Sequence, residues 1–301
     1  MSPDSLVNYD TIKEIAINSE KMGFNSLWAN EHVTRPTEET PVETIFYEPM
    51  TLLSALSSLT SKITLGTAIV ILPFRDPFVL SKEAATLYDL SGGRFVLGVG
   101  PGRFEREYTA QLKNWRERNR RIAEQIRLIR DIASGHSVNF AGKYFSSADF
   151  LIRPSAKNMP IVLGGSGPVA IKRAVELCDG IMPGHITVDD AKMMKEASDR
   201  ELDGDDKPFT FYNEIILSIA KDAEKAETKF SNNTYVRRVP YASELRTKAL
   251  VGNPDQIYEK IRQYADAGVQ EFVLIFADET KSEFLDSMEL FSSEVINRVG
   301  N

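Results

Sequence analysis

Hydrophobic residues along this 301-residue chain fall into short runs that alternate with longer amphipathic stretches. The runs are rich in Val, Ile, Leu and Phe, and their length and composition are typical of buried strands. The seven predicted strands are Phe24–Ala29, Ile63–Leu72, Phe95–Val99, Pro160–Leu163, Gly180–Met182, Phe209–Ala220 and Gln270–Phe276. Strands that alternate with helices in this way predict a parallel sheet covered by helices rather than a sandwich of two sheets.

The amphipathic stretches have helical periodicity, and several begin with proline or end next to glycine, which are typical helix boundaries. We expect helices at Asp10–Met22, Pro49–Thr60, Pro77–Leu90, Trp115–Ser134, Pro168–Leu177, Val188–Arg200, Pro254–Ala267 and Phe284–Val299. A hairpin-like excursion is expected over Asn139–Pro154. The polar stretch Asp222–Lys248 is predicted to be irregular.

The chain is therefore predicted to be an α/β protein of the TIM (β/α)8 barrel type, although seven strands are one fewer than a closed barrel requires. The deficit lies at the front, where Leu6 and Val7 are the only apolar pair before the first helix. The first strand is thus missing or truncated, because the sequence begins inside the barrel or because the barrel has a gap. A doubly wound open sheet is the structural alternative. No repeat or linker marks a boundary, so residues 1–301 are expected to form a single domain.

The composition of the chain argues against several kinds of binding partner. The net charge of −7 argues against nucleic acid, which needs a basic face to displace counterions from its phosphates. No apolar run is long enough to span a membrane, and the first residues lack the pattern of a secretory signal, so a cytoplasmic protein without a membrane partner is expected. The single cysteine, Cys178, excludes an intramolecular disulfide and a cysteine-based zinc site, and no metal is expected.

One basic cluster stands against this acidic background, formed by Arg116, Arg118, Arg120 and Arg121. It alternates with Glu117 and Glu124 in a helical stretch, so a solvated helix face is the favoured interpretation. The cluster also follows a glycine loop, where the anionic tail of a cofactor could use it.

Ligands of parallel barrels bind where the strands end, so candidate chemistry is sought there. Glu31 and His32 directly follow the strand Phe24–Ala29. His32 can exchange a proton near neutral pH, and Glu31 can orient it or stabilise its charge. The alternative is a surface loop without a role.

Two glycine-rich loops follow other strands. Gly98–Arg103 contains Gly100, Pro101, Gly102 and Arg103, but its spacing is not that of a dinucleotide fingerprint, so it is expected to line a cofactor rim. Gly164, Gly165, Ser166 and Gly167 precede a helix that begins at Pro168. Free N–H groups and the helix dipole favour a phosphate there, and glycines used only for a tight turn are the alternative.

These stretches together resemble the luciferase-like oxidoreductases, and particularly the deazaflavin-dependent branch of that family. The resemblance is carried by GFNSLWANEHVTRP, SKITLGTAIVILPFRDPFVLSKEAATLYDLSGGRFVLGVGPG, GGSGPVAIKRAVELCDGIMPG and VGNPDQIYEKIRQYADAGVQEFVLIFAD, which run from Gly23 to about Asp278.

The resemblance implies coenzyme F420 as the cofactor, with Glu31 and His32 beside its reactive ring. It implies a non-prolyl cis peptide between Ala68 and Ile69 that buttresses the ring. Pro101–Gly102 and Gly164–Gly167 fall on loops that hold the ribityl chain and the phosphate. Family members commonly form dimers, so a homodimer is expected.

Arg103 stands where some sugar-phosphate dehydrogenases of the family have a catalytic acid, which disfavours that substrate. The leading hypothesis is hydride transfer between F420 and an unidentified small organic substrate, with His32 exchanging the substrate proton and Glu31 orienting it. His185 lies after another strand and is a candidate for the substrate side, or a plain loop histidine. An FMN-dependent monooxygenase of the same fold is one alternative, and a non-catalytic flavin-binding protein is another.

Overall fold

The structure is a computed structural model that describes residues 8–34, 45–204, 206–238 and 241–299. Contacts divide the chain into two compact units. We call residues 26–40 and 46–181 the β1–β7 unit, and residues 1–25, 41–45 and 182–301 the β9–β11 unit. The expectation of a single domain stays a prediction.

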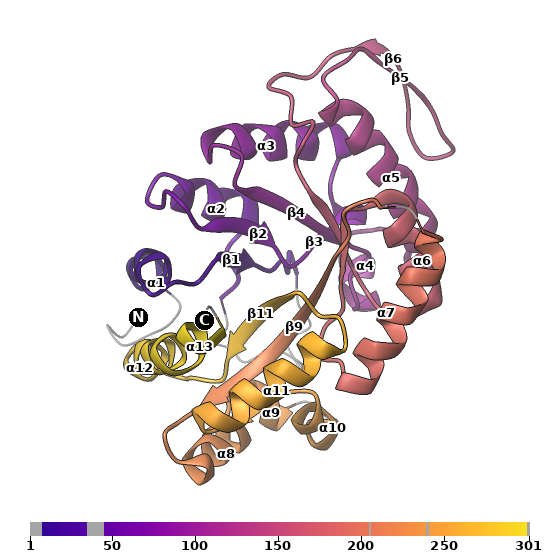
Figure 1. Ribbon diagram of the computed structural model, residues 1–301. Coiled ribbons are helices and arrows are strands. Elements are labelled where there is room, and N and C mark those ends of the chain that lie inside the picture. The colour runs from indigo at the N-terminus through magenta and orange to yellow at the C-terminus, as the bar shows by residue number, and fades with distance from the viewer. Residues whose placement is uncertain (1–7, 35–44, 205, 239–240, 300–301) are drawn as a thin grey trace. The chain divides into compact units, whose positions relative to one another are not determined.

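The β1–β7 unit is built on a parallel sheet (Figure 1). Its strands pair in the order β1 (Ser26–Ala29), β2 (Thr64–Thr67), β4 (Phe95–Gly100) and β7 (Ile161–Gly164), and β3 (Val70–Ile71) also pairs with β4. Every residue of β4 is buried, as expected for a central strand with both faces covered.

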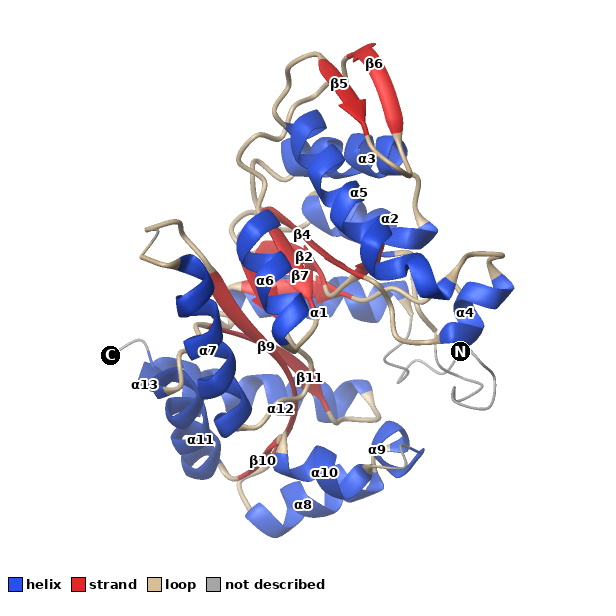
Figure 2. Ribbon diagram, turned by 90° about the vertical axis from the view of Figure 1, so that its right-hand side faces the viewer, coloured by secondary structure: helices blue, strands red, loops and turns tan. Residues whose placement is uncertain are grey.

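Helices follow these strands in the β1–β7 unit (Figure 2). They are α2 (Pro49–Ser57), α3 (Pro77–Leu90), α4 (Glu105–Ala110), α5 (Arg118–Ala133) and α6 (Pro168–Leu177). Short 3-10 turns occupy Leu72–Phe74 and Trp115–Glu117. Glu48 and Asp76 cap α2 and α3 by accepting bonds from the first free N–H groups, which explains why these helices begin at the following prolines.

An antiparallel hairpin of β5 (Val138–Ala141) and β6 (Ser146–Phe150) follows α5, as expected. The Glu124 carboxylate holds the hairpin turn by accepting hydrogen bonds from the backbone N–H groups of Lys143, Tyr144 and Phe145 at 2.7–2.9 Å. The hairpin is therefore tied to the first half of α5.

The β9–β11 unit has a second parallel arrangement, in which the long strand β9 (Thr210–Ile219) pairs with β11 (Glu271–Phe276) and, at its end, with β10 (Leu250–Gly252). The division of the chain into the two units falls within the short strand β8 (Gly180–Met182). The helices are α1 (Tyr9–Lys21), α7 (Val188–Leu202), α8 (Ala223–Asn232), α9 (Thr234–Arg238), α10 (Ala242–Thr247), α11 (Pro254–Asp266), α12 (Lys281–Phe291) and α13 (Asn297–Val299), with a π-helical turn at Ser292–Ile296.

All seven expected strands are present, with one difference inside them. The expected strand Ile63–Leu72 is interrupted at Ala68–Ile69 and becomes β2 and β3. The strand β10 is an additional strand that was not expected. The prediction that the first strand is missing or truncated concerns residues 1–7, which lie outside the described residues.

The prediction of an irregular stretch over Asp222–Lys248 was wrong, because α8, α9 and α10 occupy most of it. Asp222 caps α8, and α8 buries only Ala226 and Phe230. The polar residues on its exposed face therefore obscure the helical periodicity of its apolar positions. Phe230 packs in one cluster with Val236 of α9 and Leu245 of α10, which gives these short helices a common core.

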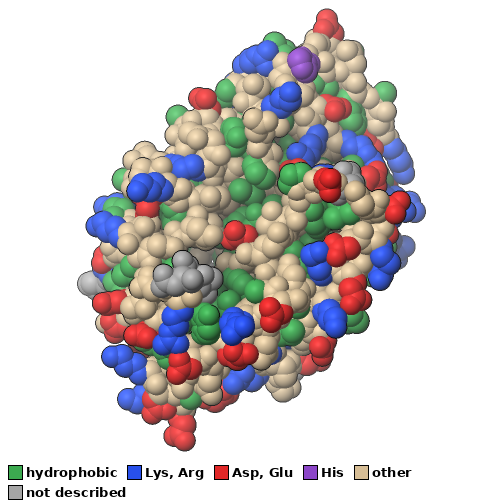
Figure 3. All heavy atoms as spheres, in the orientation of Figure 1, with side chains coloured by type: hydrophobic (Ala, Val, Ile, Leu, Met, Phe, Trp, Pro, Cys, Tyr) green, Lys and Arg blue, Asp and Glu red, His purple; other side chains and the backbone are tan. Residues whose placement is uncertain are grey.

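On the face drawn in Figure 3, acidic and basic side chains are interspersed, which is typical of a solvated surface. Among the described residues, no helix is both long and apolar enough to cross a bilayer. Cys178 is fully buried.

Candidate active site

His32 lies just after β1 and is held by a carboxylate from α4. Its Nδ1 is 3.0 Å from Oε1 of Glu107. Glu107 is only 2% exposed, and its second carboxyl oxygen is buried with no hydrogen-bond partner among the described residues. The rings of Phe46 and Phe104 flank the imidazole, with centroids 4.7 and 5.8 Å away. This arrangement fixes the ring and leaves Nε2 as the nitrogen that can exchange a proton.

Sequence reasoning missed Glu107. It lies 75 positions from His32, on a short helix that the pattern did not predict. The only local signal is its position a few residues after a glycine loop at a strand end, where functional residues gather in parallel barrels.

Glu31 has different partners from those expected. Its Oε2 accepts a 2.6 Å hydrogen bond from the backbone N–H of Ile71, and its Oε1 accepts from Arg75 Nε at 2.8 Å and also from Arg75 Nη2. Arg75 also contacts Glu48 at 2.6 Å. Burial raises the pKa of Glu31, against the opposing effect of Arg75. Among the described residues, the hydrogen-bond partner of the His32 ring is Glu107 and not Glu31, so the expected Glu31–His32 pairing is corrected.

The peptide between Ala68 and Ile69 is cis, as the resemblance implies. It lies where the chain passes from β2 to β3, and both residues are half-buried. Glu31, which follows β1, accepts a hydrogen bond from Ile71, two residues after Ile69. The buried carboxylate therefore holds the segment between β2 and β3 next to the end of β1.

The side chain of Ile69 explains several glycines. A Cβ added at Gly100 would lie 2.9 Å from Ile69 Cδ1, and one added at Gly164 would lie 2.9 Å from Ile69 Cγ2. A Cβ at Gly98 would lie 1.8 Å from the carbonyl oxygen of Thr67, which is closer than any packing permits. Gly100 and Gly164 therefore have a packing role that requires no ligand.

The loop after β4 is fixed by Tyr108, whose hydroxyl donates to the carbonyl of Pro101. Burial raises the pKa of Tyr108, so the hydroxyl stays a donor. Gly102 has a φ of +72°, and a Cβ there would lie 2.9 Å from Ile71 Cγ2. The Arg103 guanidinium lies 4.9 Å from the centre of the Phe104 ring. The Tyr108 hydrogen bond thus fixes the backbone of this loop, and the next residue, Phe104, contacts the His32 ring.

The loop after β7 has the properties of an anion site. Gly165 and Gly167 have φ of +146° and +87°, and a Cβ at Gly167 would meet nothing within 4 Å. Gly167 precedes α6, which begins at Pro168 and has no side-chain cap. Because β4 pairs with β7, this loop and the loop after β4 end on neighbouring strands. An uncapped helix start that faces open space fits a phosphate group.

His185 belongs to the other unit. Its φ is +52° and its backbone N–H donates to the carbonyl of Glu214 at 2.8 Å. Its expected place on the substrate side stays a prediction.

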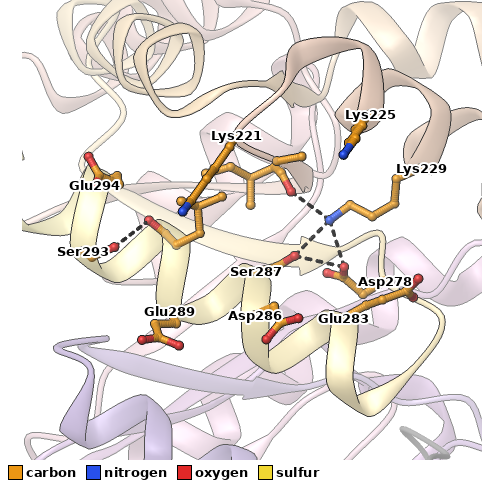
Figure 4. Close-up of a pocket in the computed structure, with 13 residues that line it drawn as sticks. Lys221, Lys225, Lys229, Asp278, Glu283, Asp286, Ser287, Glu289, Ser293 and Glu294 are labelled. Atoms are coloured by element: carbon orange, nitrogen blue, oxygen red, sulfur yellow. Dashed lines mark hydrogen bonds and ion pairs between the residues drawn. The ribbon is translucent and has the colours of Figure 1, made fainter.

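A pocket of about 680 Å³ lies in the β9–β11 unit, between the end of β9, α8 and α12 (Figure 4). The ammonium of Lys229 donates to Asp278, Ser287 and the carbonyl of Ile219, all within 2.8–2.9 Å. Burial raises the pKa of Asp278, against the effect of Lys229. Each donor of Lys229 has an acceptor, so this cluster ties α8 to the end of β9, to the segment after β11 and to α12.

A family model described as luciferase-like monooxygenase matches residues 2–248. The chain belongs to the luciferase-like monooxygenase family. By this membership the protein is an oxidoreductase. The F420-dependent glucose-6-phosphate dehydrogenase of Amycolatopsis mediterranei (strain U-32) is 28% identical over 323 residues, which cover 95% of this chain and 93% of the relative.

Two solved structures show the same fold. An F420-dependent secondary alcohol dehydrogenase in complex with an F420–acetone adduct has a TM-score of 0.82 at 19% identity, covering 97% of this chain and 96% of that one. The coenzyme F420-dependent tetrahydromethanopterin reductase of Methanopyrus kandleri has a TM-score of 0.77 at 19% identity, covering 97% and 96%. The expected TIM-type barrel class is confirmed.

Proposed function

We propose that this protein is an F420-dependent oxidoreductase that transfers a hydride between the deazaflavin and a small organic substrate. Sequence relatives named as F420-dependent dehydrogenases support the cofactor. The observation that carries the chemistry is the His32–Glu107 pair, which places a histidine with a fixed ring orientation at a strand end.

The cofactor would be held by three segments of the β1–β7 unit. The Ala68–Ile69 segment would support the ring, the backbone of Gly100–Arg103 would line the ribityl chain, and Gly164–Gly167 would bind the phosphate. The last placement rests on the uncapped start of α6. When bound, the deazaflavin supplies a ring carbon that accepts or donates a hydride.

His32 would exchange the substrate proton at Nε2. In alcohol oxidation, Nε2 takes the hydroxyl proton as the hydride leaves the carbon, and in carbonyl reduction it returns that proton. The Glu107 carboxylate accepts the Nδ1–H bond, which holds the required tautomer and stabilises the imidazolium. Glu31 acts as a positioning residue, because it binds Ile71 and Arg75.

We also propose that the partner is a small molecule rather than nucleic acid or a membrane, and that the protein is a cytoplasmic homodimer. A sugar phosphate is disfavoured, because Arg103 stands where the resemblance places a catalytic acid in sugar-phosphate dehydrogenases. Phe46 and Phe104 beside His32 favour a substrate with an apolar part.

Turnover tests this proposal. The purified protein is mixed with F420 and a panel of secondary alcohols, or with reduced F420 and a panel of ketones, aldehydes and enones, while the visible absorbance of the deazaflavin is followed. Loss of absorbance with an alcohol, or its recovery with a carbonyl compound, is the expected result. Oxygen consumption with reduced FMN, and no reaction with F420, would instead assign the FMN-dependent monooxygenase. Binding without any turnover would favour the non-catalytic alternative.

A further inference from the structure

Among the described residues, two arginines near the start of α5 have no carboxylate partner. Arg118 donates to the carbonyl of Trp115 at 2.9 Å, and Arg121 makes no hydrogen bond or ion pair with any described residue. Both are half-buried, whereas their neighbours Arg116 and Arg120 are exposed. The chain has 43 acidic residues against 36 basic ones, so two unpaired arginines on one helix face call for an explanation.

Aromatic rings fix both guanidinium groups. The Arg118 guanidinium lies 3.4 Å from the centre of the Trp115 ring, and that of Arg121 lies 4.8 Å from the centre of the Phe145 ring. The Nε of Arg121 and the hydroxyl of Tyr144 are buried without a partner among the described residues. Stacking positions a guanidinium but leaves its N–H groups unsatisfied, and buried donors without acceptors are costly. An anionic ligand with several oxygens would satisfy them.

These arginines lie beside the loop after β4. The Tyr108 hydroxyl donates to the carbonyl of Pro101, and the Tyr108 ring packs edge-on against Trp115, with centroids 5.1 Å apart. Arg118 stacks on that same Trp115 ring. A chain of three contacts therefore links Arg118 to the backbone proposed to line the cofactor.

They also lie at the same end of the unit as the proposed phosphate loop. The helices α5 and α6 pack side by side (Figure 1), through Arg127 with Glu176 at 2.6 Å and Arg130 with Asp179 at 2.5 Å. Both pairs are separated by 49 positions, so the two helices run parallel. Their first turns, which contain Arg118, Arg121 and Pro168, thus point toward the same edge of the sheet.

We propose that Arg118 and Arg121, with the Tyr144 hydroxyl, form a second anion subsite next to the Gly164–Gly167 loop. The subsite takes carboxylate or phosphate oxygens. Resting on the proposed function, its occupant is the carboxylate-bearing glutamyl tail of F420, which extends beyond the phosphate. A free anion from solution is the other source of the same chemistry.

The test compares three deazaflavins: one without phosphate or tail, one with the phosphate but no glutamates, and F420 with several glutamates. Dissociation constants are measured by ring fluorescence for the wild type and for Arg118→Gln with Arg121→Gln. We expect the double variant to bind glutamylated F420 about tenfold or more weakly and the tail-free forms unchanged, because charge-assisted bonds to the tail are lost. Arg116→Gln with Arg120→Gln is the control, because it removes the same charge from exposed positions.

Other outcomes separate the two proposals. If the double variant binds all three deazaflavins more weakly by the same factor, the arginines contribute to packing and not to a subsite. Arg121→Lys tests this packing role further, because it keeps the charge while it changes the stacking. No dependence on the tail in any variant would overturn the subsite while leaving the proposed function intact.

If no deazaflavin binds, the proposed function fails and thermal unfolding is followed with a γ-linked glutamate tripeptide and with inorganic phosphate. Stabilisation that is lost in the double variant then supports an anion subsite filled from solution, and its absence overturns the subsite as well.

Discussion

Nδ1 of His32 and Oε1 of Glu107 lie 3.0 Å apart, which joins the end of β1 to α4 through a carboxylate that is almost fully buried. A carboxylate on one ring nitrogen sets which nitrogen carries the exchangeable proton. We therefore propose for Glu107 the orienting role that the sequence had suggested for Glu31.

Glu107→Gln tests this role. The amide keeps the shape but no longer stabilises a protonated His32, so kcat is expected to fall about 10- to 100-fold, with the dissociation constant for F420 unchanged. Glu105→Gln, on the same helix and exposed, is the control. A kcat within twofold of the wild type would remove Glu107 from the mechanism.

Glu31 is expected to contribute mainly to the stability of the fold. Among the described residues, Glu31→Ala leaves Glu48 as the remaining ion-pair partner of Arg75 and frees the N–H of Ile71, so the free energy of unfolding should fall by about 3 kcal/mol. Urea unfolding followed by circular dichroism measures this change. Asp199→Asn breaks an exposed pair with Lys195 and should change the free energy of unfolding by less than about 0.5 kcal/mol. Equal effects of the two substitutions would show that the Glu31 cluster is not a structural tie.

Two glycines should respond in different ways. Gly98→Ala places a Cβ 1.8 Å from the Thr67 carbonyl, so β2 and β4 must separate and the protein should lose at least about 3 kcal/mol of stability or fail to fold. Gly167→Ala meets no atom within 4 Å and should cost about 1–3 kcal/mol, because its φ of +87° and ψ of 165° lie in a region that is restricted almost wholly to glycine. The Gly167 variant should nevertheless bind F420 more weakly, while its affinity for a phosphate-free deazaflavin stays the same. Thermal unfolding and fluorescence titration check both results.

Tyr264 gives a pH dependence with a definite sign. Its hydroxyl donates to the Ile186 carbonyl at 2.6 Å, and burial raises its pKa from 10.0 to about 12. The folded state thus keeps a proton that the unfolded state loses, so its contribution to stability is complete below pH 10 and is lost as the pH rises toward 12. In Tyr264→Phe, the free energy of unfolding should fall less steeply over this interval than in the wild type. Parallel slopes for the two proteins would contradict the assignment.

The alternation of strands and helices could be predicted because buried parallel strands must be almost wholly apolar. The seven expected strands coincide with such runs, including β4, every residue of which is buried. The helices α8, α9 and α10 could not be predicted, because each buries only one or two residues. Their common core is made by packing between helices, which no single segment displays.

The candidate site was predictable in part for a related reason. His32, the cis peptide at Ile69 and the glycine loops follow strand ends, and strand ends can be located from the pattern. The partner of His32 could not be located, because Glu107 reaches it through tertiary structure. Gly100 and Gly164 were assigned to a cofactor because they lie in glycine-rich loops at strand ends, and their packing against Ile69 could not be predicted from that pattern.

Parallel equilibrium titration of the purified protein with F420 and with FMN, followed by ring fluorescence, tests the central claim most directly. We expect saturable binding of F420 with a dissociation constant that is micromolar or lower, and binding of FMN that is at least about tenfold weaker. Tighter binding of FMN than of F420, or binding of neither, would contradict the proposed F420-dependent function.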